Sequence, residues 1–448
     1  MRTIFYSFSI FFLILSCKQN ASQSTMTNSI ETPKPKQIHK ELSKHDDVRI
    51  DEFYWLNDRE NTEVIDYLNQ ENKYYEAKTA HTKEFQEDLF QEMKSRIKED
   101  DSSVPYKYNG YWYITKYKKG KDYPIYSRKK ESLDAKEELL FDCNEMAEGH
   151  SFFNLRSINV SPDNSLVAFA LDTIGRRQYT LYVKDLETNT ILEDKVDNCT
   201  GSSTWANDNK TLFYTLKNET TLRSEAIYKH KLGADSKDDQ LVFEEKDETF
   251  SVGVYKTKSK EYLVISSYST LTTECQILNA NTPDKKFKVF QPRTRGLEYS
   301  ISHFDDSFYV LSNADDAQNF KLSKTSENNT EKRYWEDVIP HRDDVMLEGI
   351  DIFKDFLVVS ERKNGLNLIK IKRWDGSNSY YLPFDSETYT AYTTTNIDFN
   401  TDILRYGYQS MTTPSSVIDF NMATKEKTIK KEQEVLGGKF KKENYVSE

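Results

Sequence analysis

A group of short strand-like runs recurs about every 48 residues and limits the folds open to this chain. Each repeat holds four runs rich in aromatic and β-branched residues, separated by turn residues. A period in the forties with four strands per unit is typical of a β-propeller, because one unit alone cannot bury both of its faces. The sequence therefore predicts an all-β, seven-bladed β-propeller over residues 105–433. The seven units start near Pro105, Asn154, Gly201, Thr249, Leu297, Val345 and Tyr389.

Turn signals and a helical stretch support this division. Dipeptides that favour tight turns lie between apolar runs at Asn109-Gly110, Pro162-Asp163, Asn207-Asp208, Asp305-Asp306 and Asp375-Gly376. Before the repeats, Phe85, Leu89, Met93 and Ile97 recur every four residues, which is the spacing of one helix face. We expect a short N-terminal helical segment over residues 43–104 and a hinge over residues 434–448.

The first residues have the pattern of a bacterial lipoprotein leader. A positive start is followed by an apolar run that is too short for a membrane span and ends in Ile14-Leu15-Ser16-Cys17. We expect a signal peptide over residues 1–16, an acylated Cys17, and a flexible tether over residues 17–42. The protein would then be lipid-anchored in the bacterial cell envelope and face the periplasm. The alternative is an ordinary signal peptide with a cysteine by chance.

Charge and cysteine usage narrow the possible partners. The net charge of −11 disfavours nucleic acid and makes short basic peptides plausible partners, although the same charge also serves solubility alone. Cys143, Cys199 and Cys275 are isolated in the sequence, so we expect buried free thiols and no zinc site. No cofactor is expected.

The sequence contains no recognisable catalytic motif. No G-x-S-x-G is present; the most similar segment, residues 201–205, opens a repeat and lacks the second glycine. The seven histidines are scattered and are interpreted as structural. Acidic pairs such as Glu244-Glu245 and Asp315-Asp316 are interpreted as solvated turn residues. We therefore assign no catalytic, cofactor-binding or metal-binding residue, and Cys17 is the one candidate modification site.

Several ordered segments resemble one known family. The stretch SPDNSLVAFALD at residues 161–172 leads into YTLYVKDLET, and a further run, WANDNKTLFYT, begins at Trp205. Together these segments resemble the N-terminal region of the prolyl oligopeptidase family, in its oligopeptidase B (protease II) branch. The resemblance extends from about Ser43 to Glu448. Its other parts are residues 51–58, 140–150, 341–345 and 408–417.

The resemblance implies a serine endopeptidase that cleaves short peptides after Arg or Lys. In that family the propeller covers an α/β-hydrolase domain that carries the Ser-Asp-His triad. The triad would follow Glu448, so no catalytic residue is carried over to this sequence, the α/β-hydrolase domain is expected to be absent from this chain, and the chain alone is predicted to be inactive. We expect a truncated gene product, whose partner would be a C-terminal hydrolase domain encoded downstream.

Two other readings stay open. One is a stand-alone, membrane-tethered propeller that acts as a peptide- or protein-binding module. The other is a propeller with an enzymatic site of its own.

Overall fold

The computed structural model describes residues 30–446. The predicted signal peptide and Cys17 lie outside the described residues. The chain divides into two compact units, Met1–Ser95 and Arg96–Glu448. Within residues 30–446, no helix is both long enough and apolar enough to cross a membrane.

The first unit contains the expected helices. A hairpin of β1 (Glu41–Lys44) and β2 (Asp47–Ile50) comes first, followed by η1 (Tyr54–Asn57), α1 (Thr62–Thr79), η2 (Ala80–Thr82) and α2 (Lys83–Ser95). Helix α1 begins where the Asn61 side chain accepts a hydrogen bond from the Glu63 backbone N–H at 3.0 Å. On α2 the predicted apolar stripe is exposed, with Phe85 at 67% and Met93 at 53%. The hairpin was not predicted.

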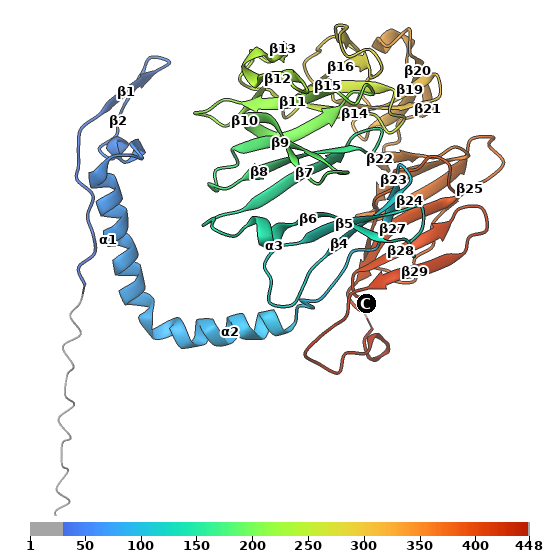
Figure 1. The fold of residues 1–448 in the computed structure, drawn as a ribbon. Coiled ribbons are helices and arrows are strands. Elements are labelled where there is room, and N and C mark those ends of the chain that lie inside the picture. The colour runs from blue at the N-terminus through green and yellow to red at the C-terminus, as the bar shows by residue number, and fades with distance from the viewer. Residues whose placement is uncertain (1–29, 447–448) are drawn as a thin grey trace, which may run out of the picture. The chain divides into compact units, whose positions relative to one another are not determined.

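The second unit is built from antiparallel sheets arranged in a ring (Figure 1). Consecutive strands pair with one another in every sheet. The first sheet holds β3 (Tyr106–Tyr108), β4 (Tyr111–Lys116), β5 (Ile125–Lys130) and β6 (Glu137–Asp142), after which comes the short helix α3 (Cys143–Met146). The next sheet holds β7 (Asn154–Val160), β8 (Leu166–Asp172), β9 (Tyr179–Asp185), β10 (Ile191–Trp205), β11 (Thr211–Lys217), β12 (Ser224–Lys231) and β13 (Gln240–Glu244), with η3 (Ser236–Asp238) before β13.

Four further four-stranded sheets complete the ring. The first two consist of β14 (Ser251–Lys256), β15 (Tyr262–Tyr268), β16 (Thr273–Asn279) and β17 (Lys288–Val289), and of β18 (Tyr299–Phe304), β19 (Ser307–Ser312), β20 (Lys321–Ser326) and β21 (Glu336–Ile339), with η4 (Lys332–Tyr334) before β21. The last two consist of β22 (Met346–Ile352), β23 (Phe356–Lys363), β24 (Leu366–Arg373) and β25 (Ser379–Tyr381), and of β26 (Tyr389–Thr393), β27 (Ile403–Ser410), β28 (Ser416–Asn421) and β29 (Lys427–Glu432). The turn η5 (Lys442–Asn444) follows.

The prediction of seven separate four-stranded blades is wrong. The described residues form five separate four-stranded blades, whereas the repeats that start near Asn154 and Gly201 share one seven-stranded sheet. The cause is β10, which runs through both repeats: its first half pairs with β9 and its second half with β11, and Cys199 pairs with both. Bulges on either side of Cys199 bend this strand without ending it.

Apolar side chains fill the junctions between neighbouring sheets. One core cluster joins β22–β25 to β26–β29 and includes the fully buried Phe353 and Tyr406, while another joins β15 and β16 to β18 and β19 around Phe290. Cys143, Cys199 and Cys275 are free and buried, as predicted, Cys143 and Cys275 in clusters of this kind and Cys199 in a cluster within the seven-stranded sheet. This inter-sheet burial stabilises the ring, because no sheet can bury both of its faces alone.

The junction between the last and first sheets, here called the closing junction, is more polar. Among the described residues, no core cluster joins β26–β29 to β3–β6. Arg405 instead donates to the Pro105 carbonyl at 2.7 Å and pairs with Asp419, and Lys431 pairs with Asp101 at 2.6 Å. A cavity of about 940 Å³ lies along this junction. The ring therefore closes through charged side chains and not through a shared strand.

The predicted turns are confirmed. Each of the five dipeptides lies between consecutive strands of one sheet. Asn109 and Gly110 both have positive φ, 49° and 82°, which is the requirement of a two-residue turn between β3 and β4.

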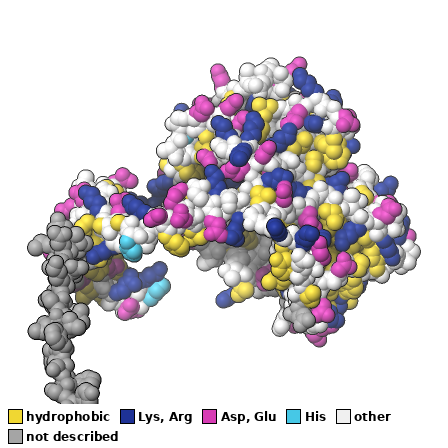
Figure 2. Space-filling model, turned by 90° about the horizontal axis from the view of Figure 1, so that it is seen from below, with side chains coloured by type: hydrophobic (Ala, Val, Ile, Leu, Met, Phe, Trp, Pro, Cys, Tyr) yellow, Lys and Arg dark blue, Asp and Glu magenta, His cyan; other side chains and the backbone are white. Residues whose placement is uncertain are grey.

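Positive and negative side chains are mixed over the face of the second unit that Figure 2 shows.

Candidate substrate channel

A central cavity of about 580 Å³ lies where the first strands of several sheets meet. Residues from β3, β7, the second half of β10, and β14 line it together, so these strands face a common space. The indole N–H of Trp205 donates to the Asn159 carbonyl at 2.9 Å and holds β10 against β7. The lining includes Tyr108, Asn109, Asn159, Ser202, Trp205, Asn207, Tyr255, Lys256 and Lys260.

The turn between β14 and β15, residues 257–261, reaches across one end of this space and is here called the crossing turn. Lys260 Nζ lies 3.5 Å from Asn109 Oδ1 and 4.6 Å from the centre of the Tyr108 ring. Lys258, from the same turn, contacts a different sheet: its Nζ donates to the carbonyl of Ile352, at the end of β22, at 2.7 Å. The crossing turn therefore contacts the sheets that contain β3 and β22, in addition to its own sheet β14–β17.

Burial lowers the pKa of two lysines in this region. Desolvation, together with a smaller effect of the nearby Lys260, lowers the pKa of Lys256 to about 8. Desolvation also lowers the pKa of Lys258 to about 8, although the carboxylates of Asp351 and Asp398 oppose the shift. Near neutral pH these ammonium groups are still mostly protonated, and Lys256 offers hydrogen-bond donors to the central cavity that it lines.

A second cavity of about 590 Å³, here called the basic cavity, shares Tyr255 with the central cavity. It carries three cationic side chains, Arg156, Arg177 and Lys217. Arg177 belongs to the loop between β8 and β9, and Lys217 ends β11. The two cavities are therefore adjacent, with Ser202, Val254 and Tyr255 in the shared wall, and each of them is lined by cationic side chains. The remaining lining is rich in hydroxyl groups, from Thr200, Ser202, Thr215, Thr221, Ser224, Tyr255, Ser266 and Tyr268.

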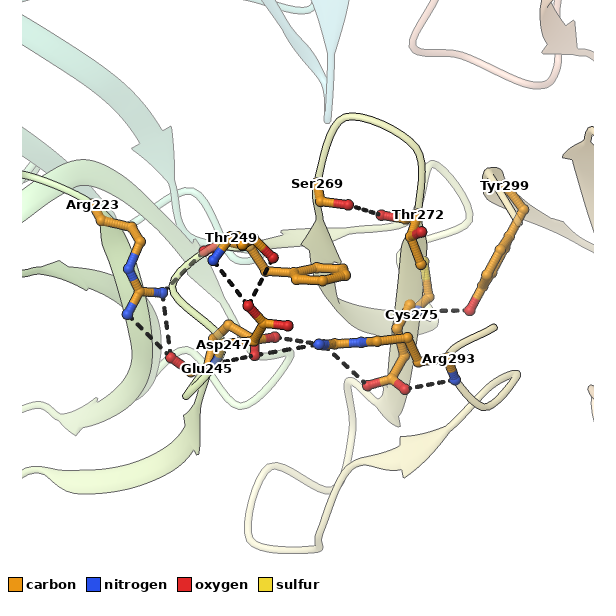
Figure 3. A network of polar contacts seen from close by, with 11 residues as sticks. Arg223, Glu245, Asp247, Thr249, Ser269, Thr272, Cys275, Arg293 and Tyr299 are labelled. Atoms are coloured by element: carbon orange, nitrogen blue, oxygen red, sulfur yellow. Dashed lines mark hydrogen bonds and ion pairs between the residues drawn. The ribbon is translucent and has the colours of Figure 1, made fainter. Parts of the chain in front are cut away.

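A network of ion pairs connects sheets β7–β13 and β14–β17 (Figure 3). Arg293 pairs with Glu245 at 2.5 Å and stacks on the Phe250 ring at 3.8 Å. Arg223 donates to the Phe250 carbonyl at 2.9 Å. Burial alone would raise the pKa of Glu245, but the Arg293 guanidinium holds this pKa below its usual range. Glu245 is only 5% exposed, so its interpretation as a solvated turn residue is wrong.

The histidines have structural partners that the sequence did not reveal. The His230 ring lies between Asp239 at 2.8 Å and Asp194 at 3.0 Å. Burial opposes its protonation, but these two carboxylates raise the pKa of His230 above its usual value. These two hydrogen bonds of His230 connect β12 to β10 and to the segment before β13.

One histidine belongs to a group that could hold a metal ion. Ligand atoms of Glu261, His303 and Glu327 lie within 4.8 Å of one another. Both ring nitrogens of His303 already have partners at 2.9 Å, namely the Ser259 hydroxyl and the Glu327 carboxylate. The ring is therefore satisfied without an ion, and the group fits a structural role.

The segment over residues 201–205 is not a nucleophile elbow. Ser202 and Ser203 lie inside β10, in extended backbone, and no helix follows them. The channel lysines and arginines were missed in the sequence. The available signal was the group of three lysines, Lys256, Lys258 and Lys260, at the end of an apolar run.

Comparison with known families decides the identity of this unit. Residues 33–433 match the family described as Prolyl oligopeptidase, N-terminal beta-propeller domain. The chain belongs to the prolyl oligopeptidase family. It is a propeller domain of that family, and its relatives include oligopeptidase B-like proteins. The predicted resemblance is confirmed.

Two curated relatives and one solved structure illustrate the similarity. Dipeptidyl aminopeptidase BI of Pseudoxanthomonas mexicana is 38% identical over 92% of this chain, and Protease 2 of Moraxella lacunata is 31% identical over 89%. Oligopeptidase B from Leishmania major superposes with a TM-score of 0.85 at 28% identity, over 94% of this chain and 62% of that structure. The chain spans 59% and 58% of the lengths of the two curated relatives.

Proposed function

We propose that this propeller admits short peptides to an α/β-hydrolase domain and excludes folded proteins, as part of an oligopeptidase B-like serine endopeptidase that cleaves after Arg or Lys. The observation that supports the proposal is the central cavity, at which the crossing turn contacts strands of two other sheets. A passage of this kind selects substrates by size. The net charge of −11 supports attraction of basic peptides to the protein as a whole.

The hydrolase domain would supply the chemistry. Acyl transfer needs an activated nucleophile and an oxyanion hole, and we assign neither to residues 30–446. The propeller's role in this proposal is selection by size, together with contacts to the parts of the peptide that lie outside the catalytic centre.

The test is a peptidase assay with and without a hydrolase domain. We expect no hydrolysis of Arg- or Lys-ended peptides or esters by residues 18–448 alone. The same chain joined to a family hydrolase domain should cleave them, and a serine-directed reagent should abolish the activity. Turnover by the isolated chain that survives this reagent would overturn the proposal and indicate a site within the propeller. A joined protein that folds but binds peptides without cleaving them would favour the binding-module alternative.

We further propose that Cys17 carries a lipid and tethers the protein in the bacterial cell envelope, facing the periplasm. The sequence Ile14-Leu15-Ser16-Cys17 after an apolar run supports this proposal. Cys17→Ala should yield an unprocessed or soluble form, whereas the parent protein should fractionate with membranes after expression in a bacterial host. Unchanged migration and membrane partition of the variant would contradict lipidation.

A further inference from the structure

The basic cavity holds three cationic side chains that lack an anionic partner. Within residues 30–446, Arg156, Arg177 and Lys217 form no ion pair with a carboxylate. The Arg156 guanidinium lies 5.9 Å above the Tyr179 ring. The carboxylate of Asp172 belongs to the same region, but its oxygens accept the backbone N–H groups of residues 174, 175 and 177 at 2.7–2.9 Å. Asp172 therefore offsets part of the positive charge near Lys217, but it forms no ion pair with any of the three cations.

Lys217 is the most informative of the three. Its side chain is buried, with 8% exposure, and its ammonium donates to the Arg177 carbonyl. Desolvation lowers the pKa of Lys217, and the charges of Arg177 and Arg156 lower it further, while Cys199 and Asp172 oppose the shift. Holding a buried ammonium beside two guanidinium groups has an electrostatic cost, which Asp172 offsets only in part. A bound carboxylate would offset this repulsion.

A second observation points to a ligand independently of charge. Thr215 is only 1% exposed and lines the basic cavity, yet its hydroxyl has no hydrogen-bond partner among the described residues. Buried polar groups are normally paired, so an unpaired hydroxyl in a cavity wall is available to a bound molecule. It lies two residues before Lys217 on β11, on the same side of the strand.

We propose that the basic cavity binds the C-terminal carboxylate of a peptide held in the channel. This inference rests on the proposed passage of peptides through the propeller. Guanidinium groups donate paired N–H bonds that match a planar carboxylate. The cavity volume of about 590 Å³ and the hydroxyl-rich walls accommodate peptide residues next to that carboxylate, and not only a small anion. Arg156 and Arg177 bind the carboxylate, while Lys217 and Thr215 form the floor of the site.

The experiment measures binding of matched peptides to the 448-residue chain. The probes are an N-acetylated alanine tripeptide with a free C-terminal carboxylate, the same tripeptide as the amide, and an amidated tripeptide with glutamate in the middle. We expect the amide to bind about tenfold more weakly than the free acid, which corresponds to about 1.4 kcal/mol. The glutamate peptide should bind as weakly as the amide.

Substitutions in the basic cavity test whether the difference in affinity between the free-acid and amide peptides arises there. Arg156→Gln and Arg177→Gln should lower free-acid binding to the level of the amide. Arg333→Gln is the matched control, because this arginine is 67% exposed in η4 and should leave binding unchanged. Both cavity arginines are exposed, so these variants are expected to fold, and thermal unfolding followed by circular dichroism checks this.

Three results would overturn the inference. They are equal binding of acid and amide, equal binding of the free acid and the glutamate peptide, and displacement of the free acid by an equal concentration of inorganic phosphate, which would show a general anion site. Failure of the proposed function is distinct, because it would leave the acid–amide difference intact while the protein joined to a hydrolase fails to cleave.

Discussion

Replacing Gly201 with alanine is expected to lower the free energy of unfolding by about 3 kcal/mol, because two costs combine. Gly201 has φ of +79°, a left-handed conformation that alanine adopts only with strain. A Cβ atom at this position would also lie 2.9 Å from Cγ of Tyr179. That ring is buried, with 5% exposure, and its hydroxyl is bonded to Asn154, so it has little room to move. Chemical denaturation measures the loss.

Gly233→Ala separates the two costs. Gly233 has nearly the same φ, +83°, but an added Cβ would meet no atom within 4 Å. This variant should lose only the conformational part, about 1–2 kcal/mol. Equal losses in the two variants would contradict the proposed steric conflict, since they would show that Tyr179 moves aside at no cost.

Arg293→Met is expected to destabilise the protein by about 3 kcal/mol at pH 7, because it leaves the buried Glu245 carboxylate without its cationic partner. In the parent protein the pKa of Glu245 is lowered, so the ion pair contributes fully above the ordinary glutamate range and is lost as the pH falls through the lowered value. In the variant, burial without a partner raises this pKa. The stability difference between the two proteins should therefore shrink as the pH falls from 7 towards 5.

Unfolding free energies measured across this pH range test the prediction. The double variant Arg293→Met with Glu245→Gln removes the titrating group, so its difference from Glu245→Gln alone should not change with pH. A destabilisation by Arg293→Met that is constant between pH 7 and 5 would contradict the assignment. The loss would then come from packing on Phe250, which Arg293 covers at 3.8 Å.

Local sequence signals predicted the elements of this protein well. The repeat of about 48 residues and the turn dipeptides located the strands, and the four-residue spacing of Phe85, Leu89 and Met93 located α2. These patterns depend on neighbouring residues, so they can be read from one sequence. Which repeats form separate sheets was harder to predict. The polar residues before Gly201 have the composition of a connection between units, but two bulges keep them within β10.

The channel and the neighbouring ion-pair network could not be predicted, because their contacts join residues far apart in the chain. Glu245 and Arg293 are 48 residues apart, about one repeat, and Lys260 and Asn109 are 151 residues apart. Propensity and periodicity carry no information about such pairs. Glu245 therefore had the features of an ordinary acidic turn residue until its neighbour across the junction was known.

Strand β10 makes the ring mechanically uneven. Two repeats share this strand, so pulling them apart requires the rupture of a ladder of backbone hydrogen bonds, whereas neighbouring sheets elsewhere are joined by side chains and isolated backbone hydrogen bonds. We therefore expect that a force pulling the sheets of the ring apart separates another junction before it breaks the seven-stranded sheet. The closing junction, which has charged contacts and no core cluster, is the place where such a ring first yields.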